Sequence, residues 1–419
     1  MGLLCMQVRR VAISLLIAHI LSLLGFSTYA VALTQLQQEW GLTNSEAGWI
    51  ASGFFLGYVA TVSTWYSLTD VMDARRIYAA GSLIAASAGI GFALGAEGFG
   101  SALLFQVLLG VGIAATYMPG LKILSDRTRG REQSRFVAFY TAFFGLGAAS
   151  SLFIAGQSLP RIGTHWTFFL CALGPLMALL LVLSSTRPLA HERGRQAVSW
   201  SLHRLFPLRT WRSVLSDRKC LGYTVGYGVH CAELFGSRAW SVAFLAFSAS
   251  LLPAGTVSWM TAATAAAVVS VFSVPASILG NEVALRIGRR AWIVMVMAVT
   301  SFIGVSMALM AGSGWWIVFG LFLAYSVFIM ADSATLTAGL VASAQPEVKG
   351  AAMGLYSLIG FGGGGVLGPA VFGAALDWSQ GGATPQDWAI GFAVLGLGCV
   401  LFPLFDWWLH RSSPFKASS

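Results

Sequence analysis

The apolar part of this chain contains a few side chains that can bind a proton or a polar solute. Three of them lie in the segment GVHCAELFGSRAW, namely His230, Glu233 and Arg238. An ionisable side chain at the centre of a membrane helix costs about 2.5–3.5 kcal/mol on insertion scales, so its presence there indicates a function. His230 and Glu233 are three residues apart, which on a helix places them on one face and within hydrogen-bonding reach. The candidate binding residues are completed by His19, Tyr117 and Asp332.

Long apolar segments position these side chains. Each has about twenty residues, enough to cross a hydrocarbon core of ~30 Å at ~1.5 Å per residue. Only 10% of the residues are charged and 57% are apolar, whereas about 25% are charged in soluble proteins. The sequence therefore predicts an all-α integral membrane protein with twelve transmembrane helices, at 11–33, 47–66, 77–96, 101–123, 137–157, 166–185, 221–246, 256–280, 291–311, 315–343, 351–376 and 388–408.

The distribution of positive charge predicts the topology. With a cytoplasmic amino terminus, all but two of the 25 Lys and Arg residues fall in cytoplasmic segments. The two exceptions are Arg161, on the outer side, and Arg238, within a helix. The positive-inside rule thus places both termini in the cytoplasm. The net charge of +9 is then a topology signal that matches anionic lipid headgroups, and we expect no nucleic-acid partner.

Two motifs recur at a nearly constant spacing, which indicates an internal repeat. The second copies follow 214 and 215 residues after the first: Arg75-Arg76 and Arg289-Arg290, Gly145-Leu-Gly147 and Gly360-Phe-Gly362. Parallel repeats of this kind are known in transporters. We expect a six-helix bundle at 1–185, a cytoplasmic loop at 186–219, a second bundle at 220–410 and a cytoplasmic tail at 411–419.

The central loop contains one amphipathic stretch, PLRTWRSVLSDRK, which begins at Pro207. Proline suits the first turn of a helix. Apolar side chains alternate with arginines along this stretch, which is typical of an interfacial helix on the inner leaflet; a flexible linker is the equal alternative.

The loop after the second helix resembles a signature of the major facilitator superfamily, G-x-x-x-D-R-x-G-R-R. In TDVMDARR, Asp70 stands at the acidic position and Arg75 at the last basic one. GNEVALRIGRR, which ends at Arg290, is similar and occupies the matching place in the second half. The resemblance covers the whole chain and implies two pseudo-symmetric bundles. It also implies a cytoplasmic gate formed by Asp70, Arg75, Arg76, Glu282, Arg286, Arg289 and Arg290.

In this superfamily the first, fourth, seventh and tenth helices line a central cavity, so the resemblance places the candidate binding residues there. The repeat spacing pairs Glu233 with His19 and Asp332 with Tyr117. A carboxylate in a partly desolvated cavity suits reversible proton binding, and histidine titrates near neutral pH. We expect Glu233 and Asp332 to carry protons, while His19, His230 and Arg238 hold the solute. The alternative is that these are polar links between helices.

Two further features bear on the class of transporter. Gln106 stands where many members of the superfamily carry an arginine in the fourth helix. The fifth helix lacks the G-x-x-x-G-P motif of drug/proton antiporters, while GFGGGGVLGP, with Pro369, occurs in the eleventh. Such glycine-rich segments indicate close helix contact and bending.

These observations predict a secondary active transporter of a small polar or anionic solute, working by alternating access and coupled to protons. We expect a monomer in a bacterial inner membrane, with no cofactor and no metal. The sequence lacks phosphate-binding loops, metal-ligand clusters and nucleophile triads, so we do not expect an enzyme. Two alternatives remain: a drug or metabolite efflux proton antiporter, and a non-transporting membrane sensor or assembly factor on the same scaffold.

Overall fold

Helices make up nearly all of the described chain in this computed structural model. The structure describes residues 2–69, 72–128, 130–188, 208–253, 260–346 and 348–411, without the side chains of residues 2–8, 130, 131, 134, 138, 410 and 411. Within these ranges no residue lies in a β-strand. The chain divides into two compact units.

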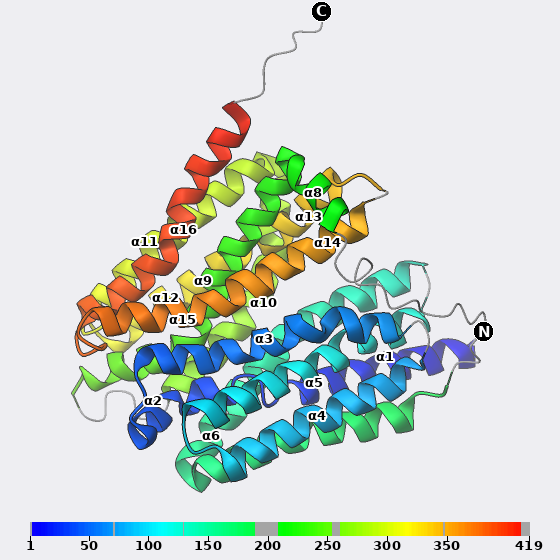
Figure 1. Cartoon of the computed structure of the whole chain (residues 1–419), viewed down its shortest axis with the longest axis horizontal. Coiled ribbons are helices and arrows are strands. Elements are labelled where there is room, and N and C mark those ends of the chain that lie inside the picture. Colours follow the sequence, from blue (N-terminus) through cyan, green and yellow to red (C-terminus); the bar gives the residue numbers. More distant parts are fainter. Residues whose placement is uncertain are drawn as a thin grey trace, which may run out of the picture. The chain divides into compact units, whose positions relative to one another are not determined.

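The first unit comprises Met1–Ser201, Ser241–Ala246 and Val257–Val271. Helix α5 packs against α3 and α4, and α6 packs against α1 and α4 (Figure 1). Glycine permits the closest of these approaches, since a Cβ at Gly110 of α5 would overlap the Phe54 carbonyl of α3. The helices are α1 (Gly2–Ser22), α2 (Thr28–Trp40), α3 (Asn44–Leu68), α4 (Ala74–Gly95), α5 (Phe99–Ser125) and α6 (Gly130–Ser185).

Helix α6 covers both the fifth and the sixth predicted helices. Its course is interrupted at Gly163, whose φ of 75° lies in the left-handed region that glycine adopts without strain. The two predicted helices are therefore present, joined by a one-residue kink in place of the longer loop at 158–165 that the sequence predicted.

The second unit comprises Leu202–Trp240, Phe247–Thr256 and Phe272–Ser419, so α9 and α10 each contribute residues to both units. Helix α11 packs against α16, and α16 also against α15. The elements are α8 (Leu208–Ser216), α9 (Arg218–Ser250), α10 (Ala262–Ile287), α11 (Arg289–Leu309), α12 (Trp315–Ala331), α13 (Ser333–Ser343), α14 (Lys349–Ser357), the π-helix η1 (Leu358–Gly364), α15 (Gly365–Trp378) and α16 (Pro385–Arg411).

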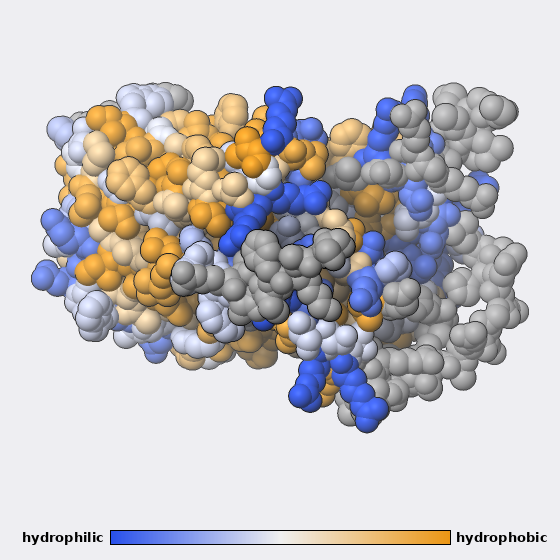
Figure 2. Space-filling view, turned by 90° about the horizontal axis from the view of Figure 1, so that it is seen from above, coloured by the Kyte–Doolittle hydropathy of each residue, from blue (hydrophilic) through white to orange (hydrophobic). Residues whose placement is uncertain are grey.

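Much of the surface is apolar, as a lipid-facing surface requires. Figure 2 shows broad apolar areas on the visible face, and large apolar side chains such as Trp378 and Leu94 are more than three-quarters exposed. Among the described residues eight helices are long and apolar enough to cross a membrane. One of these, Arg135–Ser185, contains two of the predicted crossings. The total of twelve crossings stays a prediction.

The first predicted helix, 11–33, is broken. Helix α1 ends at Ser22 and α2 begins at Thr28. A buried serine of α6 bridges the gap: Ser151 Oγ accepts a hydrogen bond from Ser27 N (2.9 Å) and donates one to Leu24 O (2.6 Å). Backbone groups freed by a helix break need partners inside a membrane, and Ser151 supplies two of them from a neighbouring helix.

The tenth predicted helix, 315–343, is also broken, at Asp332 between α12 and α13. Here the partners come from α10 and α11. The Trp292 indole N–H donates to Ala331 O (2.9 Å), and Ser277 Oγ accepts from Ala334 N (3.2 Å). Gly280 of α10 makes room for this contact, because a Cβ there would overlap the Ala331 carbonyl.

The helix caps refine the repeat spacing at one place. Helix α4 begins after the cap Asp73 and α11 after the cap Gly288, which is 215 residues later. At this spacing Arg75 corresponds to Arg290, whereas the sequence spacing of 214 paired Arg75 with Arg289.

The amphipathic stretch of the central loop forms α8, which packs against the second unit. Val214 is buried, and Trp211 and Leu215 lie against the same apolar cluster. Arg209 and Arg212 are exposed on α8. The apolar side of this helix therefore contacts protein, and its position on the inner leaflet stays a prediction.

Candidate functional site

The second unit contains a buried ion-pair contact between two of the predicted binding residues. His230 Nδ1 of α9 lies 2.8 Å from Asp332 Oδ1, with the side chains 2% and 3% exposed. Asp332 is the residue between the end of α12 and the start of α13, so this contact lies at the helix break. The net charge of the pair depends on whether it holds a proton. Because both side chains are buried, solvent does not screen that charge.

Glu233 has different partners from those that the sequence predicted. Its Oε2 accepts hydrogen bonds from Thr300 Oγ1 of α11 (3.0 Å) and from Cys399 Sγ of α16 (3.2 Å). The side chain is buried, and within the described residues it makes no hydrogen bond with His230. The i, i+3 spacing therefore places both residues at one level of α9 while their side chains contact different helices.

A stack of aromatic rings continues from His230. Tyr227 lies nearly parallel to His230, with ring centroids 5.8 Å apart, and flat on Tyr356, with centroids 3.8 Å apart and planes at 6°. The Tyr356 hydroxyl hydrogen-bonds Thr337 Oγ1 (2.9 Å). Tyr227 and Tyr356 were not among the predicted site residues, although the i, i+3 spacing of Tyr227 and His230 was a usable signal.

The first unit brings the other predicted pair together. His19 of α1 lies 5.2 Å from Tyr117 of α5 between ring centroids, and it stacks on Tyr140 of α6 at 4.3 Å. His19 and Tyr140 are at most 1% exposed. Among the described residues, neither ring nitrogen of His19 has a hydrogen-bond partner. The neighbouring Tyr78 donates to Ala18 O (3.3 Å).

The six candidate binding residues thus fall into two groups, one in each unit. His19 and Tyr117 form the first group, and His230 and Asp332 form the second. Glu233 lies beside the second group on α9, and Arg238 follows on the same helix, partly exposed. Within the described residues no three His, Cys, Asp or Glu side chains are arranged as metal ligands.

Arg75, a predicted gate residue, is bound inside the first unit. Its Nε donates to Thr186 Oγ1 (2.8 Å) and a terminal nitrogen donates to Leu183 O (3.1 Å), both at the end of α6. Asp73 Oδ2 lies 3.8 Å from Arg75 Nη1. In the loop between α5 and α6, burial lowers the pKa of the Arg127 guanidinium, and the charge of Asp73 opposes this shift.

Arg290 makes the corresponding contact in the second unit. Its guanidinium pairs with Asp406 near the end of α16. Arg75 is therefore held at the end of α6, and Arg290 near the end of α16. Asp70 lies outside the described residues, Arg289 is partly buried, and the remaining predicted gate residues are exposed: Arg76, Glu282 and Arg286.

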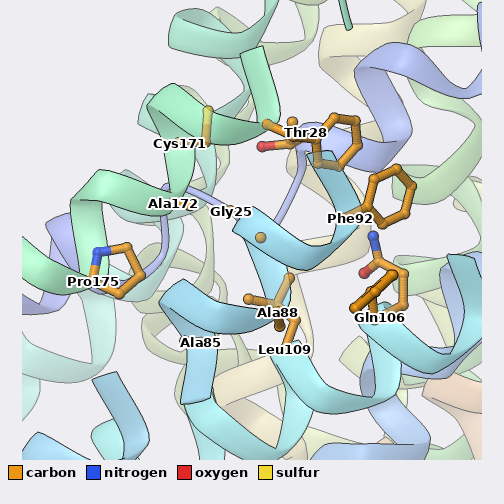
Figure 3. A pocket seen from close by; sticks show the side chains of 13 residues that line it. Gly25, Thr28, Ala85, Ala88, Phe92, Gln106, Leu109, Cys171, Ala172 and Pro175 are labelled. Carbon is orange, nitrogen blue, oxygen red and sulfur yellow. The ribbon is translucent and has the colours of Figure 1, made fainter. Parts of the chain in front are cut away.

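A small pocket lies next to the break between α1 and α2. Figure 3 shows Gly25 and Thr28 on one side of it and the Gln106 carboxamide of α5 on another. Gln106 is 3% exposed. The neutral Gln106 amide is therefore enclosed by residues of α2, α4, α5 and α6.

A family model described as the Major Facilitator Superfamily matches residues 15–369. The chain belongs to the major facilitator superfamily. This confirms the resemblance found in the sequence and makes the chain a multi-pass membrane protein. The family and its fold neighbours are transporters and not enzymes.

Known members of the superfamily match part of the sequence. The niacin transporter NiaP of Acinetobacter baylyi is 24% identical over 40% of this chain and 38% of its own length. The puromycin resistance protein pur8 of Streptomyces alboniger is 27% identical over 40% of this chain and 33% of its own. The matches thus span between a third and two-fifths of these curated relatives.

Solved structures of the superfamily share the fold over nearly the whole chain. A bacterial homologue of the human lysosomal transporter Spinster, inward-facing and unoccupied, has a TM-score of 0.76 at 14% identity and covers 96% of both chains. The nucleoside transporter NupG has a TM-score of 0.76 at 14% identity, covering 96% of this chain and all of its own. At these identities the likeness concerns the fold alone.

Proposed function

We propose that this superfamily member is a secondary active transporter that moves a small anionic solute together with protons by alternating access. The observation that carries the proposal is the buried contact between His230 and Asp332 beside a helix break. Discontinuous membrane helices commonly form the binding sites of transporters. Ionisable residues at this depth mark solute or proton pathways by default.

The charge of the pair explains how proton and solute binding support each other. With a neutral imidazole and an ionised Asp332, the pair carries one uncompensated negative charge in a dry site, which is costly. Taking up one proton makes the pair neutral and removes a repulsion against a nearby anion. By linkage, a bound anion favours the proton equally. Mutual stabilisation of this kind is what symport requires.

The solute class rests on side chains of α9 and on one relative. His230 and Arg238 of α9 can supply positive charge, and a role for His19 in holding the solute stays a prediction. The relative named as a niacin transporter handles a small aromatic carboxylate. We take nicotinate as the first probe for this chain, with nicotinamide as its uncharged analogue.

The setting follows the charge pattern of the loops. We place the chain in a bacterial inner membrane as a monomer of twelve crossings, with both termini and the loop 186–219 in the cytoplasm. Arg76 and Arg290 belong in this proposal to a cytoplasmic gate, together with the other charged residues of the two signature loops.

The test uses purified protein in liposomes with an imposed pH gradient. We expect nicotinate, and not nicotinamide, to accumulate against its concentration gradient. Asp332→Asn and Glu233→Gln should abolish gradient-driven accumulation and retain exchange of solute down its own gradient, because exchange does not require net proton movement. Glu97→Gln is the control, since Glu97 is an exposed carboxylate in the loop between α4 and α5.

The outcomes separate the alternatives. Accumulation at wild-type levels in both Asp332→Asn and Glu233→Gln would contradict the proton assignment. Proton-driven export of puromycin without nicotinate uptake would establish the efflux antiporter, which the relative named for puromycin resistance favours. A folded protein that moves neither probe, nor any member of a panel of small carboxylates, would favour the sensor or assembly factor.

A further inference from the structure

We infer that the pocket beside the break between α1 and α2 is a binding site for one water molecule, which Gln106 and the Gly25 peptide hold together. The site would link α5 to the broken first helix. It lies wholly within the first unit and does not depend on which solute the protein transports.

Gln106 is the first reason for a polar ligand here. A primary amide can donate two hydrogen bonds and accept two. The side chain is 3% exposed, and among the described residues its carboxamide forms no hydrogen bond. Buried polar groups without any partner are rare and costly, so such a group indicates an ordered water or another ligand.

The backbone of the break is the second, independent reason. Around Gly25 each neighbouring N–H is bonded: Leu24 N to Leu21 O, Phe26 N to Leu23 O, and Ser27 N to Ser151 Oγ. Within the described part of the chain, the Gly25 N–H and carbonyl have no such partner. Gly25 and Gln106 both line the pocket (Figure 3).

The size and the walls of the pocket select the ligand. Its volume is about 10 Å³, close to the smallest cavity that admits one water. Phe92, Leu109 and Phe168 form apolar walls, so polar partners are confined to a few atoms. Besides Gln106 and Gly25, the Thr28 hydroxyl lies here and can accept, because its proton is donated to Leu24 O (3.1 Å). A buried water needs two to four partners, and this site offers them.

Helix α3 approaches the first side-chain atom of Gln106 closely. A Cβ at Gly53 would lie 3.2 Å from Gln106 Cβ and 2.9 Å from a Leu103 methyl. The base of the Gln106 side chain is thus packed against α3.

The most direct test is a density map of the wild-type protein at a resolution where buried waters are visible. We expect a peak within hydrogen-bonding distance of the Gln106 carboxamide and of the Gly25 backbone. A pocket without density, in a map that shows other buried waters, would overturn the inference.

A pair of variants of α5 tests the energetic role. Gln106→Met keeps the length of the side chain and removes the amide. Thr116→Val is the matched control, because the buried Thr116 hydroxyl bonds Ile113 O of its own helix (3.0 Å). We expect Gln106→Met to lower the thermal midpoint and to raise hydrogen exchange at the Gly25 amide about tenfold, as loss of one ordinary buried hydrogen bond would. Thr116→Val should leave hydrogen exchange at the Gly25 amide unchanged.

The sign of the effect decides between a wet and a dry pocket. In a dry apolar cavity the methionine would fill space and remove an unsatisfied amide, so the midpoint would rise and exchange at Gly25 would stay unchanged. That result, in a folded Gln106→Met protein, would contradict the proposed water site.

Discussion

Gly360 packs directly against the ring of Tyr227, leaving no room for a side chain. A Cβ at Gly360 would overlap that ring and lie 3.1 Å from Cys231 Sγ. Tyr227 cannot give way easily, because its ring is stacked on Tyr356. Gly360 belongs to the π-helix η1, and π-helical turns are frequent at functional sites. The first copy of this motif, Gly145-Leu-Gly147, lies in the α-helical part of α6 that precedes the interruption at Gly163.

Gly360→Ala should therefore destabilise the protein, because the added methyl group forces Tyr227 from its stack. Overpacking of this kind costs about 1–3 kcal/mol. Gly363→Ala in the same π-helix is the control, since a Cβ at Gly363 meets nothing within 4 Å. The measurement is the thermal midpoint in detergent. Equal midpoints for the two variants would show that the Tyr227 stack is not rigid.

Ser151→Ala should loosen the break between α1 and α2. It leaves Ser27 N without a partner, while Leu24 O keeps the Thr28 hydroxyl as a donor (3.1 Å). An unsatisfied buried group costs about 1–3 kcal/mol. We expect a lower thermal midpoint and faster hydrogen exchange at Ser27. Ser150→Ala, at a partly exposed neighbour, should leave both unchanged. If the two variants behave alike, Ser151 does not support the break.

The breaks themselves could not have been predicted from the sequence. The stretch LLGFS at 23–27 continues an apolar run and contains one glycine, a pattern compatible with an unbroken membrane helix. The side chain that bonds the backbone at this break is Ser151, which is more than a hundred residues away in the chain. Hydropathy depends on local composition and could predict where long apolar helices lie, while the two signature loops identified the superfamily.

The candidate site was predictable in its members and not in its contacts. An ionisable side chain inside a membrane costs free energy, and this cost identified His230, Glu233 and Asp332 as candidates from the sequence. Spacing along α9 could not tell that Glu233 contacts Thr300 and Cys399, because those residues come from two distant helices. Tyr356 was missed because tyrosines are common in apolar segments and carry no distinguishing pattern, whereas Tyr227 could have been found from its i, i+3 spacing to His230.

Arg290 and Asp406 provide a test of whether the signature arginines act within one unit. Arg290 is half exposed and Asp406 nearly buried, so we expect their coupling in a double-mutant cycle to be about 0.5–1 kcal/mol. Arg290→Ala and Asp406→Ala should each lower the thermal midpoint, and the double variant should lower it by less than the sum. Strict additivity would mean that the ion pair contributes nothing.

Arg76 offers the complementary test of the gate. It is exposed, so Arg76→Ala should leave the thermal midpoint unchanged. As a gate residue it should slow turnover in liposomes without weakening equilibrium binding of the solute. Loss of binding affinity with normal turnover would place Arg76 outside the gate.

The topology can be tested by labelling single introduced cysteines in intact cells. Four native cysteines are buried, so background reaction should be low. Cysteines at positions 190 and 412 should resist a membrane-impermeant thiol reagent, whereas Gly382→Cys should react, because the outer side is accessible. Reaction at position 190 in sealed cells would contradict the cytoplasmic placement of both the loop and the termini.

The two helix breaks have a consequence for how the shape of this protein can vary. Ser151, Ser277 and Trp292 belong to helices other than the ones they interrupt. The bend in each broken helix is therefore encoded in its neighbours. A substitution in α6 or α10 can straighten or redirect a helix whose own residues are unchanged, so relatives with identical first and tenth segments need not share their bends.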